Sequence, residues 1–405
     1  MEESWAATAD GPGHLVETTH YQLYAEVHAD EAQTIARMLE GEWAALADWW
    51  EATPDTSDGE LLAVELYATE AAWADAIVDD GLDVPWGAGG YYHPTTGIAY
   101  LYAQPTVWYT RVLSLHEALH QYHHRARTRG ASVPGWFAEG HAEYLSLHDW
   151  DGQCLRLGRL PLLSLEDMPS SALGRADEGE LDLAAHIAGE ESISRPLEWA
   201  IFRYFDRADE GELAGSWRTF RDAVDGGATD RLAEFEAAFG TSPSSFDGPL
   251  HDWLASEQQP MESVWLEWTH VDPGRVDGFS DVMSVAPLKE APDHFELRFA
   301  VPDEPTWWGG AMLSFDDSSN FVALLVGSDG TLSTFELHDG DAVWNDAGPA
   351  PEAQDGAYSL SLDHGTADTT VTINGQTATF PLAYSPAGGP ALYEARIRFE
   401  GIAWR

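Results

Sequence analysis

The sequence contains little cysteine and little lysine. Cys154 is the single cysteine among 405 residues, and Lys289 is the single lysine, so the other basic residues are arginines. With one cysteine, no disulfide can form within the chain, and a zinc site built on several cysteines is excluded. A cysteine nucleophile is not expected either, because no His or Asn arrangement accompanies Cys154.

Long apolar runs are also missing. No run approaches the roughly 18 residues that a membrane-spanning helix needs, and the first residues, Met-Glu-Glu-Ser-Trp, lack the basic and apolar parts of a signal peptide. We therefore expect no membrane insertion. Phosphate-binding and calcium-binding loop patterns are absent as well.

Basic side chains are few and acidic ones dominate. The chain has 69 aspartates and glutamates against 20 lysines and arginines, a formal net charge of −49. A surface this acidic repels nucleic-acid phosphates and anionic lipids, so we expect no nucleic-acid partner. The composition is typical of proteins that stay soluble in high salt and of acidic secreted proteins. We expect an extracytoplasmic or secreted protein, with the cytoplasm of a halophile as the alternative.

Apolar residues, in contrast, are plentiful, at 44% of the chain with 18 tryptophans. This excludes a disordered chain and is enough for two globular domains. A polar break at residues 258–260 separates two patterns, so we predict a multidomain α+β protein with one domain over 1–258 and another over 262–405. Within the first, 1–105 is a mixed α/β part and 106–258 a helical part.

Periodicity predicts the elements of the first domain. Apolar residues alternate in the expected strands and recur at helical spacing in the expected helices. The predicted strands are 21–27, 61–67 and 97–102. The predicted helices are 30–50, 69–78, 109–127, 134–147, 196–205, 217–224, 231–239 and 250–254.

Beyond residue 262, short alternating strands are separated by Gly, Asp, Asn and Pro turns, and Asn374-Gly375 predicts a hairpin. The predicted strands are 294–301, 311–315, 321–326, 331–337, 357–362, 369–373 and 391–399. The pattern predicts an all-β sandwich and resembles a concanavalin-like or laminin-G-like jelly roll. Trp307 and Trp308 could be exposed and bind a glycan, or could pack in the core.

The motif that carries chemistry is His116-Glu117-Ala118-Leu119-His120. Two histidines four apart project from one helix face and can share a tetrahedral zinc ion. Glu117 lies beside that face, where a carboxylate can act as general base on water. Glu139, on the next predicted helix, can complete a His₂Glu ligand set. Glu143 is one turn further along and can accept the second ring N–H of a ligand histidine.

These residues resemble a known family. His116-Glu117-x-x-His120, eighteen intervening residues and Glu139, within Trp136-x-x-Glu-Gly-x-Ala-Glu-Tyr144, resemble the gluzincin metallopeptidases and are most similar to the peptidase MA-like group. The resemblance is specific over 90–147. It implies a thermolysin-like catalytic domain of mixed sheet and helical part, Zn²⁺ held by His116, His120 and Glu139, and hydrolysis of a peptide or protein substrate with Glu117 as base.

One departure from the family concerns the substrate's free amine. The gluzincin aminopeptidases carry a Gly-x-Met-Glu-Asn strand whose Glu holds that amine, whereas the matching strand here, 97–104, has no acidic residue. We therefore expect an endopeptidase. The strand's edge can pair with an extended peptide, which makes Tyr100 a candidate substrate-binding residue. His141, two residues after Glu139, is a second candidate.

Peptide hydrolysis also needs a group that stabilises the oxyanion. Tyr204, on the predicted helix 196–205, is the first candidate and His186 the second. His123 and His124 continue the active-site helix and are expected on its surface, with a position at the border of the cleft as the alternative for each. Two other functions remain as hypotheses. One is hydrolysis of a non-peptide bond, and the other is glycan or surface binding by a protein with a degenerate or occluded peptidase scaffold.

Overall fold

The computed structural model describes residues 2–4, 13–56, 59–128, 132–164, 166–189, 194–262 and 268–405. The chain divides into two compact units, Met1–Leu160 with Glu166–Gln258, and Pro161–Leu165 with Gln259–Arg405. A short segment that the sequence analysis assigns to the first domain thus packs with the second unit. Leu163 lies in the core of that unit, and Leu162 O accepts a hydrogen bond from Met261 N–H over 2.9 Å.

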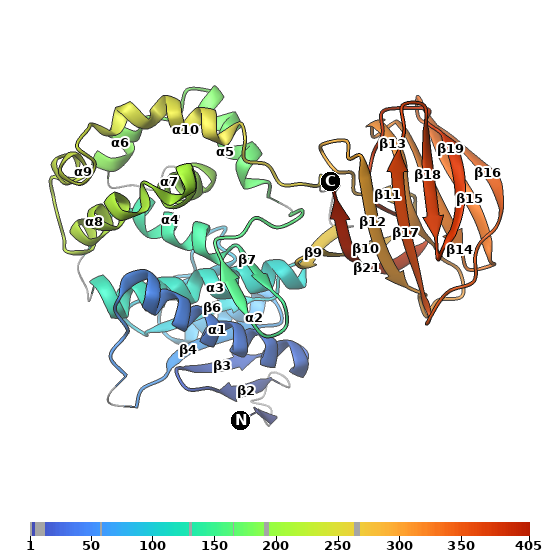
Figure 1. Cartoon of the computed structure of the whole chain (residues 1–405). Helices are drawn as coiled ribbons and strands as arrows, with labels where there is room; N and C mark the ends of the chain where they lie inside the picture. The colour runs from blue at the N-terminus through green and yellow to red at the C-terminus, as the bar shows by residue number, and fades with distance from the viewer. Residues whose placement is uncertain are drawn as a thin grey trace. The chain divides into compact units, whose positions relative to one another are not determined.

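A mixed sheet organises the first unit (Figure 1). The strand order is β1-β2-β3-β4-β6-β5. Strands β3, β4 and β6 run parallel, while β2 and β5 pair antiparallel with β3 and β6. The bounds are β1 (Glu2–Ser4), β2 (His14–Glu17), β3 (Tyr21–Ala25), β4 (Leu62–Tyr67), β5 (Gly90–His93) and β6 (Ile98–Tyr102).

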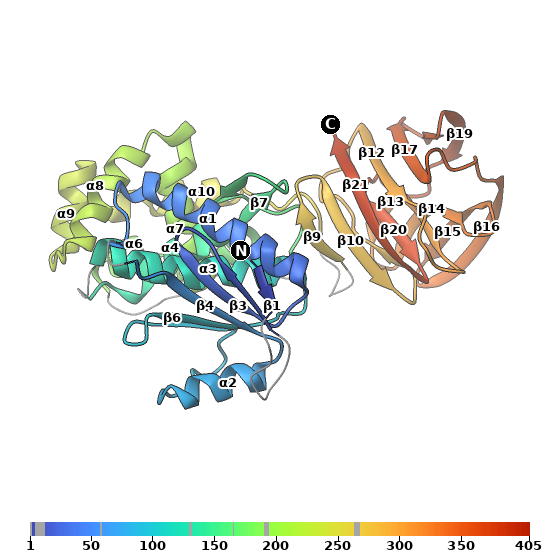
Figure 2. The same cartoon turned by 90° about the horizontal axis from the view of Figure 1, so that it is seen from below.

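Helices cover both faces of this sheet. α1 (Ala29–Trp50) and α3 (Val107–His123) pack together on one face, and α2 (Glu70–Asp79) packs on the other, as Figure 2 shows. Side chains of β6 alternate accordingly, because successive residues of a strand point to opposite faces. Ala99 and Leu101 join the core beneath α3, whereas Tyr100 packs with Trp73 of α2.

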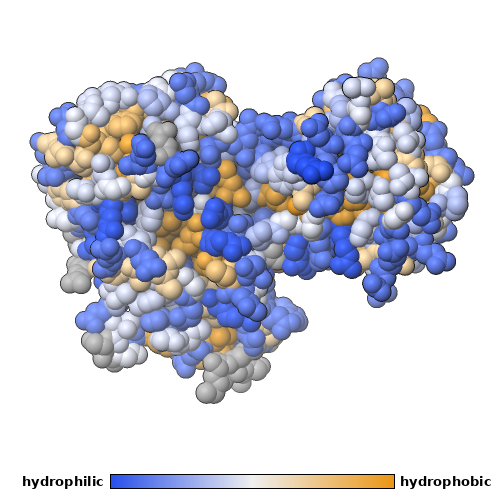
Figure 3. Space-filling view, viewed as in Figure 1, coloured by the Kyte–Doolittle hydropathy of each residue, from blue (hydrophilic) through white to orange (hydrophobic). Residues whose placement is uncertain are grey.

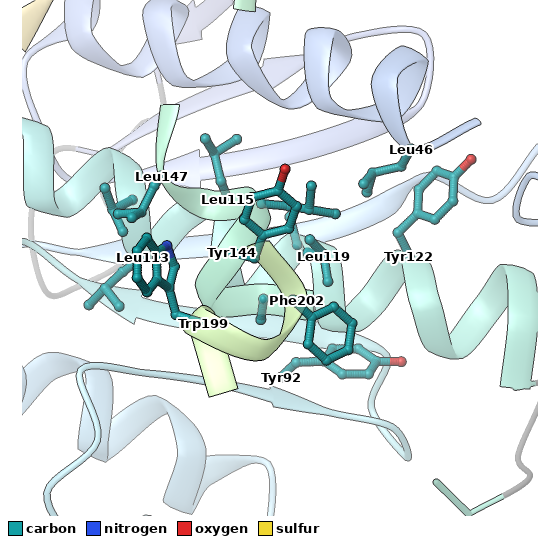
Figure 4. Packing of buried hydrophobic residues seen from close by; sticks show 14 of the residues in the cluster. Leu46, Tyr92, Leu113, Leu115, Leu119, Tyr122, Tyr144, Leu147, Trp199 and Phe202 are labelled. Atoms are coloured by element: carbon teal, nitrogen blue, oxygen red, sulfur yellow. The ribbon is translucent and has the colours of Figure 1, made fainter. Parts of the chain in front are cut away.

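The rest of the first unit is helical, apart from a small hairpin of β7 (His148–Trp150) and β8 (Leu155–Leu157). Its helices are α4 (Gly135–Ser146), α5 (Met168–Asp177), α6 (Leu183–Ala188), α7 (Arg195–Arg207), α8 (Ala214–Asp225), α9 (Arg231–Phe239) and α10 (Asp247–Leu254). α4 packs closely on α7: a Cβ at Gly140 would lie 2.3 Å from Phe202 Cδ2. Figure 4 shows Phe202 and Trp199 among the core side chains around α3 and α4.

The second unit is an all-β sandwich of a seven-stranded sheet, β19-β18-β17-β12-β21-β10-β9, and a six-stranded sheet, β11-β20-β13-β14-β15-β16. The prediction of a multidomain α+β protein with a C-terminal all-β sandwich is confirmed. The bounds are β9 (Trp268–Asp272), β10 (Arg275–Ser280), β11 (Ser284–Val285), β12 (His294–Ala300), β13 (Trp308–Asp317), β14 (Asn320–Gly327), β15 (Thr331–His338), β16 (Asp341–Pro349), β17 (Ala357–His364), β18 (Asp368–Ile373), β19 (Gln376–Pro381), β20 (Pro390–Tyr393) and β21 (Ala395–Trp404).

Several predicted elements differ from the structure. The strand predicted over 391–399 is two strands, β20 and β21, which belong to different sheets and meet at Glu394, whose φ is 48°. The helix predicted over 109–127 ends as an α-helix at His123 and continues as a π-helical turn over His124–Thr128. Strand β16 was missed, because nearly all its side chains are exposed and it lacks apolar alternation.

The surface reflects the acidic composition. The face shown in Figure 3 is largely hydrophilic, with smaller apolar areas between the polar ones. Among the described helices, none combines the length and the apolar character that crossing a bilayer requires.

Candidate metal centre

Helix α3 carries the first two candidate ligands in a buried setting. Its N-terminus is capped by Thr106, whose side chain accepts a hydrogen bond from Tyr109 N–H over 3.1 Å. Nearly every side chain of the helix is buried, since α1 covers it on one side and the sheet on another. His116 and Glu117 are buried, and His120 is partly exposed toward a cleft.

The three predicted ligands come together in space. Nε2 of His116 lies 3.1 Å from Nε2 of His120, and Glu139 Oε2 and Oε1 lie 3.4 Å and 3.5 Å from these two nitrogens. In a tetrahedral zinc site, with metal–ligand bonds of about 2.0–2.1 Å, neighbouring ligand atoms are about 3.3–3.4 Å apart. The donor types and their spacing therefore fit a zinc ion, and these residues form a group able to hold a metal.

The electrostatics of the three side chains are those of a cation site. Burial alone would raise the pKa of the Glu139 carboxyl, but His120 and His116 outweigh it and hold that pKa well below its usual range. Burial likewise opposes the charged form of His120, but the Glu139 carboxylate raises the pKa of His120 to about 9. An ionised carboxylate thus faces two imidazoles, and a bound cation would take the place of the proton on His120.

Glu117 is positioned by the edge strand β5. Its Oε2 accepts a hydrogen bond from Tyr92 N–H over 2.7 Å. The strand approaches this closely because residue 90 is glycine: a Cβ there would lie 2.7 Å from Glu117 Cγ and 2.8 Å from Oε1. Burial raises the pKa of Glu117 above its ordinary value, which is the direction a general base needs.

Glu143 faces the outer nitrogen of one ligand. Its side chain is 2% exposed, and Oε1 lies 3.7 Å from His116 Nδ1, which is longer than a hydrogen bond. The same oxygen accepts a hydrogen bond from Arg195 Nε, at the start of α7. Glu143 thus lies beside His116, but the hydrogen bond predicted between them is not formed, and the structure adds an arginine that the sequence analysis did not name.

A cleft of 570 Å³ opens onto these groups. Among the described residues that line it, Arg195 is the single arginine and no lysine occurs. The lining residues are Trp86, Gly87, Ala88, Gly89, Gly90, Tyr91, Tyr92, Pro94, Leu113, His116, Glu117, His120, His123, His124, Thr128, Val133, Ala138, Glu139, Glu143 and Arg195.

Neither candidate for oxyanion stabilisation lies at this cleft. Tyr204 is 3% exposed and packs its ring against Phe205, Phe246 and Trp253, so the prediction for Tyr204 is wrong. His186 lies on α6, where its Nε2 hydrogen-bonds to Glu180 O over 3.0 Å. Tyr204 is therefore held in the helical core and His186 by a hydrogen bond near the surface, and neither lines the cleft.

The two candidate substrate-binding residues are also buried elsewhere. Tyr100 is 0% exposed and donates a hydrogen bond to Asp80 on the α2 face of the sheet, and β6 is an interior strand without a free edge. His141 is 0% exposed, with its ring against Trp50 and Phe202 and its Nδ1 3.0 Å from Phe137 O. Both substrate-binding predictions are wrong, because each side chain points into a core.

His123 corrects a further expectation. Its ring stacks on Trp50 and its Nε2 lies 2.7 Å from Asp225 Oδ1, with both side chains nearly fully buried, so it is not a surface residue. The alternative is confirmed, because His123 and His124 both line the cleft. Trp307 is 4% exposed and packs in the sandwich core, while Trp308 is partly exposed. The prediction that Trp307 packs in the core is therefore confirmed.

Comparison with known proteins found solved structures of similar fold, but no similar family or curated protein. No protein-family model matches the chain, and no curated protein matches it. Solved structures similar to its C-terminal sandwich include a carbohydrate-binding module, CBM66, from Bacillus subtilis, at 16% identity over 33% of this chain and 88% of that one, with a TM-score of 0.28. The agglutinin CG-16 from chicken liver shares 16% identity over 30% and 99%, with a TM-score of 0.25. Caenorhabditis elegans galectin LEC-6 shares 11% identity over 33% and 99%, with a TM-score of 0.26.

Proposed function

We propose that the first unit is a zinc-dependent peptidase with a thermolysin-like catalytic domain. The observation that carries the proposal is the spacing of 3.1, 3.4 and 3.5 Å among His116 Nε2, His120 Nε2 and the Glu139 oxygens, with Glu117 beside them. When bound there, zinc supplies a Lewis acid and lowers the pKa of a coordinated water toward neutrality.

Residues of the chain supply the proton transfers and the hydrogen-bond donor that the hydrolysis needs. Glu117, held by Tyr92 N–H, accepts a proton as the water oxygen bonds to the scissile carbonyl carbon. It then gives that proton to the departing amine nitrogen as the C–N bond breaks. Arg195 lines the cleft, donates to Glu143 through Nε and is 42% exposed, so we propose it as the donor to the substrate carbonyl oxygen.

The carboxylates of the cleft favour cleavage within a chain over removal of its first residue. An aminopeptidase needs a carboxylate to hold the substrate's free amine. Among the described lining residues the carboxylates are Glu117, Glu139 and Glu143, and each already has a partner: Tyr92 N–H, the two ligand histidines and Arg195. Strand β5 beside the cleft carries no acidic residue. We therefore propose an endopeptidase.

The test combines metal analysis with cleavage of a peptide library. The full chain, purified without added metal, should contain about one zinc per molecule and cleave internal peptide bonds. Glu117→Gln should keep the zinc and lose cleavage, while Glu65→Gln, a carboxylate of strand β4 outside the cleft, should change neither. Zinc without cleavage by the unmodified protein would contradict the peptidase and favour another substrate or an occluded cleft. Absence of zinc would overturn the metal site.

A second candidate function, glycan binding, has its own observation in the sandwich. The rings of Trp308, Trp344 and Tyr393 form a mutually contacting group, with centroid distances of 5.3 to 5.9 Å, and Trp344 is 42% exposed. Exposed aromatic faces stack on sugar rings. We propose this group as the glycan contact. Binding of the full chain to a glycan array should fall on Trp344→Ala and persist on Trp404→Ala, a tryptophan 39% exposed on the other sheet. Equal binding by both variants would exclude this contact.

A further inference from the structure

Trp86 is the most exposed large apolar side chain among the described residues. It is 100% exposed, whereas the next, Val282, is 59% exposed. An indole carries more apolar surface than any other side chain, and leaving it in water forgoes the favourable free energy of its burial. Trp86 and Gly87 form a turn, and Gly87, with φ at 71°, has open space around it. The turn thus presents the ring to solvent.

This side chain belongs to the wall of the metal cleft. Trp86 lines the same cleft as His116, Glu117, His120 and Glu139. The segment that carries it is fixed to α3 three residues later, because a Cβ at Gly89 would lie 2.7 Å from Leu113 Cδ1. Leu113 is one helical turn before Glu117. The exposed ring therefore stands on a short, anchored segment next to the proposed reaction site.

The surroundings of Trp86 in the cleft indicate what it would contact. Besides its polar residues, the cleft that Trp86 lines has an apolar or aromatic share: Ala88, Tyr91, Pro94, Leu113, Val133 and Ala138. The charged lining residues, Glu117, Glu139, Glu143 and Arg195, have partners of their own. The complementary group for an exposed indole beside apolar lining is an apolar side chain.

We propose that Trp86 is a specificity-determining residue, which packs against an aromatic or large aliphatic side chain of the polypeptide substrate near the scissile bond. The proposal rests on the proposed function for its substrate class. The proposal specifies which substrates the cleft selects. It concerns substrate binding and leaves the chemical step unchanged.

The experiment has a cleavage arm and a binding arm. In the first, the zinc-loaded full chain, Trp86→Ala, Trp86→Phe and Trp404→Ala each cleave a peptide library, and mass spectrometry reads the residues that flank the cut. In the second, Glu117→Gln and Glu117→Gln/Trp86→Ala bind a fluorescent peptide carrying Phe, and the same peptide with Gly in its place. Trp404 is the matched control because it is exposed, lies in the other unit and does not line the cleft.

We expect a preference for an apolar residue at one position, which Trp86→Ala weakens about tenfold and Trp86→Phe largely retains. In the binding arm, affinity for the Phe peptide should fall about tenfold on loss of Trp86, with affinity for the Gly peptide and zinc content unchanged. Unchanged selectivity and affinity in Trp86→Ala, or a preference for basic residues, would overturn the proposal. Trp86-dependent binding without cleavage by the unmodified protein would support it while contradicting the peptidase reaction.

Discussion

The backbone N–H of Tyr92 donates a hydrogen bond to Oε2 of Glu117 over 2.7 Å, so the outermost strand of the sheet holds the carboxylate of the proposed base. One carboxylate oxygen is thereby engaged, and the other, Oε1, lies against Gly90. The contact joins residues 25 apart in the chain. It makes the orientation of Glu117 a property of the sheet edge as much as of helix α3.

Gly90→Ala tests this arrangement without touching a ligand. The new methyl group would lie 2.7 Å from Glu117 Cγ and must displace the carboxylate or the strand. We expect the catalytic rate to fall about a hundredfold, because small misplacements of a catalytic group cost about that much. Zinc content should be unchanged. Gly174→Ala, where a Cβ meets nothing within 4 Å, is the control, and equal rates for both variants would contradict a role for the close approach.

Removal of the metal should lower stability as well as abolish activity. If His116, His120 and Glu139 hold zinc as proposed, the bound ion would add to the free energy of unfolding by mass action. A chelator should therefore lower the melting temperature of the unmodified protein. His120→Ala should lose stoichiometric zinc and show no chelator effect, while His186→Ala, whose ring hydrogen-bonds away from the cleft, should behave like the unmodified protein. A chelator shift that survives in His120→Ala would contradict this ligand set.

Arg195→Ala should reduce kcat by about a hundredfold if the guanidinium stabilises the oxyanion. Because Glu143 is 2% exposed and loses its partner, the variant should also be less stable. Arg195→Lys separates the effects, since it keeps a charge near Glu143 and loses the planar donor group. Arg203→Ala is the matched control, as Arg203 pairs with Glu257 outside the cleft. Unchanged kcat in Arg195→Lys and Arg195→Ala would remove the arginine from the reaction.

The buried carboxyl group of Glu42 should make the free energy of unfolding depend on pH. Its side chain is 0% exposed, neither carboxylate oxygen has a hydrogen-bond partner among the described residues, and burial raises its pKa well above the ordinary value. A raised folded-state pKa means that stability is fully present below the unfolded pKa and is lost as pH rises. Glu42→Gln should therefore raise the free energy of unfolding at pH 7, and by much less at pH 4.5.

Glu40, on the same helix, provides the opposite control for Glu42. Its carboxylate lies 2.7 Å from His20 Nδ1, and although burial opposes it, hydrogen bonds from Thr18 and His20 lower its pKa. Its stabilising contribution is present above the unfolded pKa and is lost as pH falls. Glu40→Gln should then destabilise the protein at pH 7. Denaturant unfolding of the three proteins in the same high-salt buffer measures both effects, and the same sign for both variants would refute the assignment.

Local sequence was sufficient for part of the site. The four-residue spacing of His116 and His120 places both rings on one helix face wherever the helix packs, because that spacing is a property of the α-helix itself. Apolar alternation likewise located strands β3, β4 and β6 and most strands of the sandwich, since burial of one face requires it. Glu139 could be chosen because it is a carboxylate on the next predicted helix, which can fold back onto the two histidines.

Tertiary packing determines which other residues reach the cleft. Tyr204 and Arg195 share helix α7 but are nine residues apart, which places them about 180° apart around its axis. Packing of Phe202 against Gly140 fixes the rotation of α7 on α4, so Arg195 meets Glu143 while Tyr204 enters the helical core. Strand order and the two faces of the sheet likewise decide the places of two tyrosines. Tyr92, on β5, reaches Glu117 through its N–H, whereas Tyr100, on β6, packs against α2 on the other face. Such contacts join residues distant in the chain, and only the packed structure selects among them.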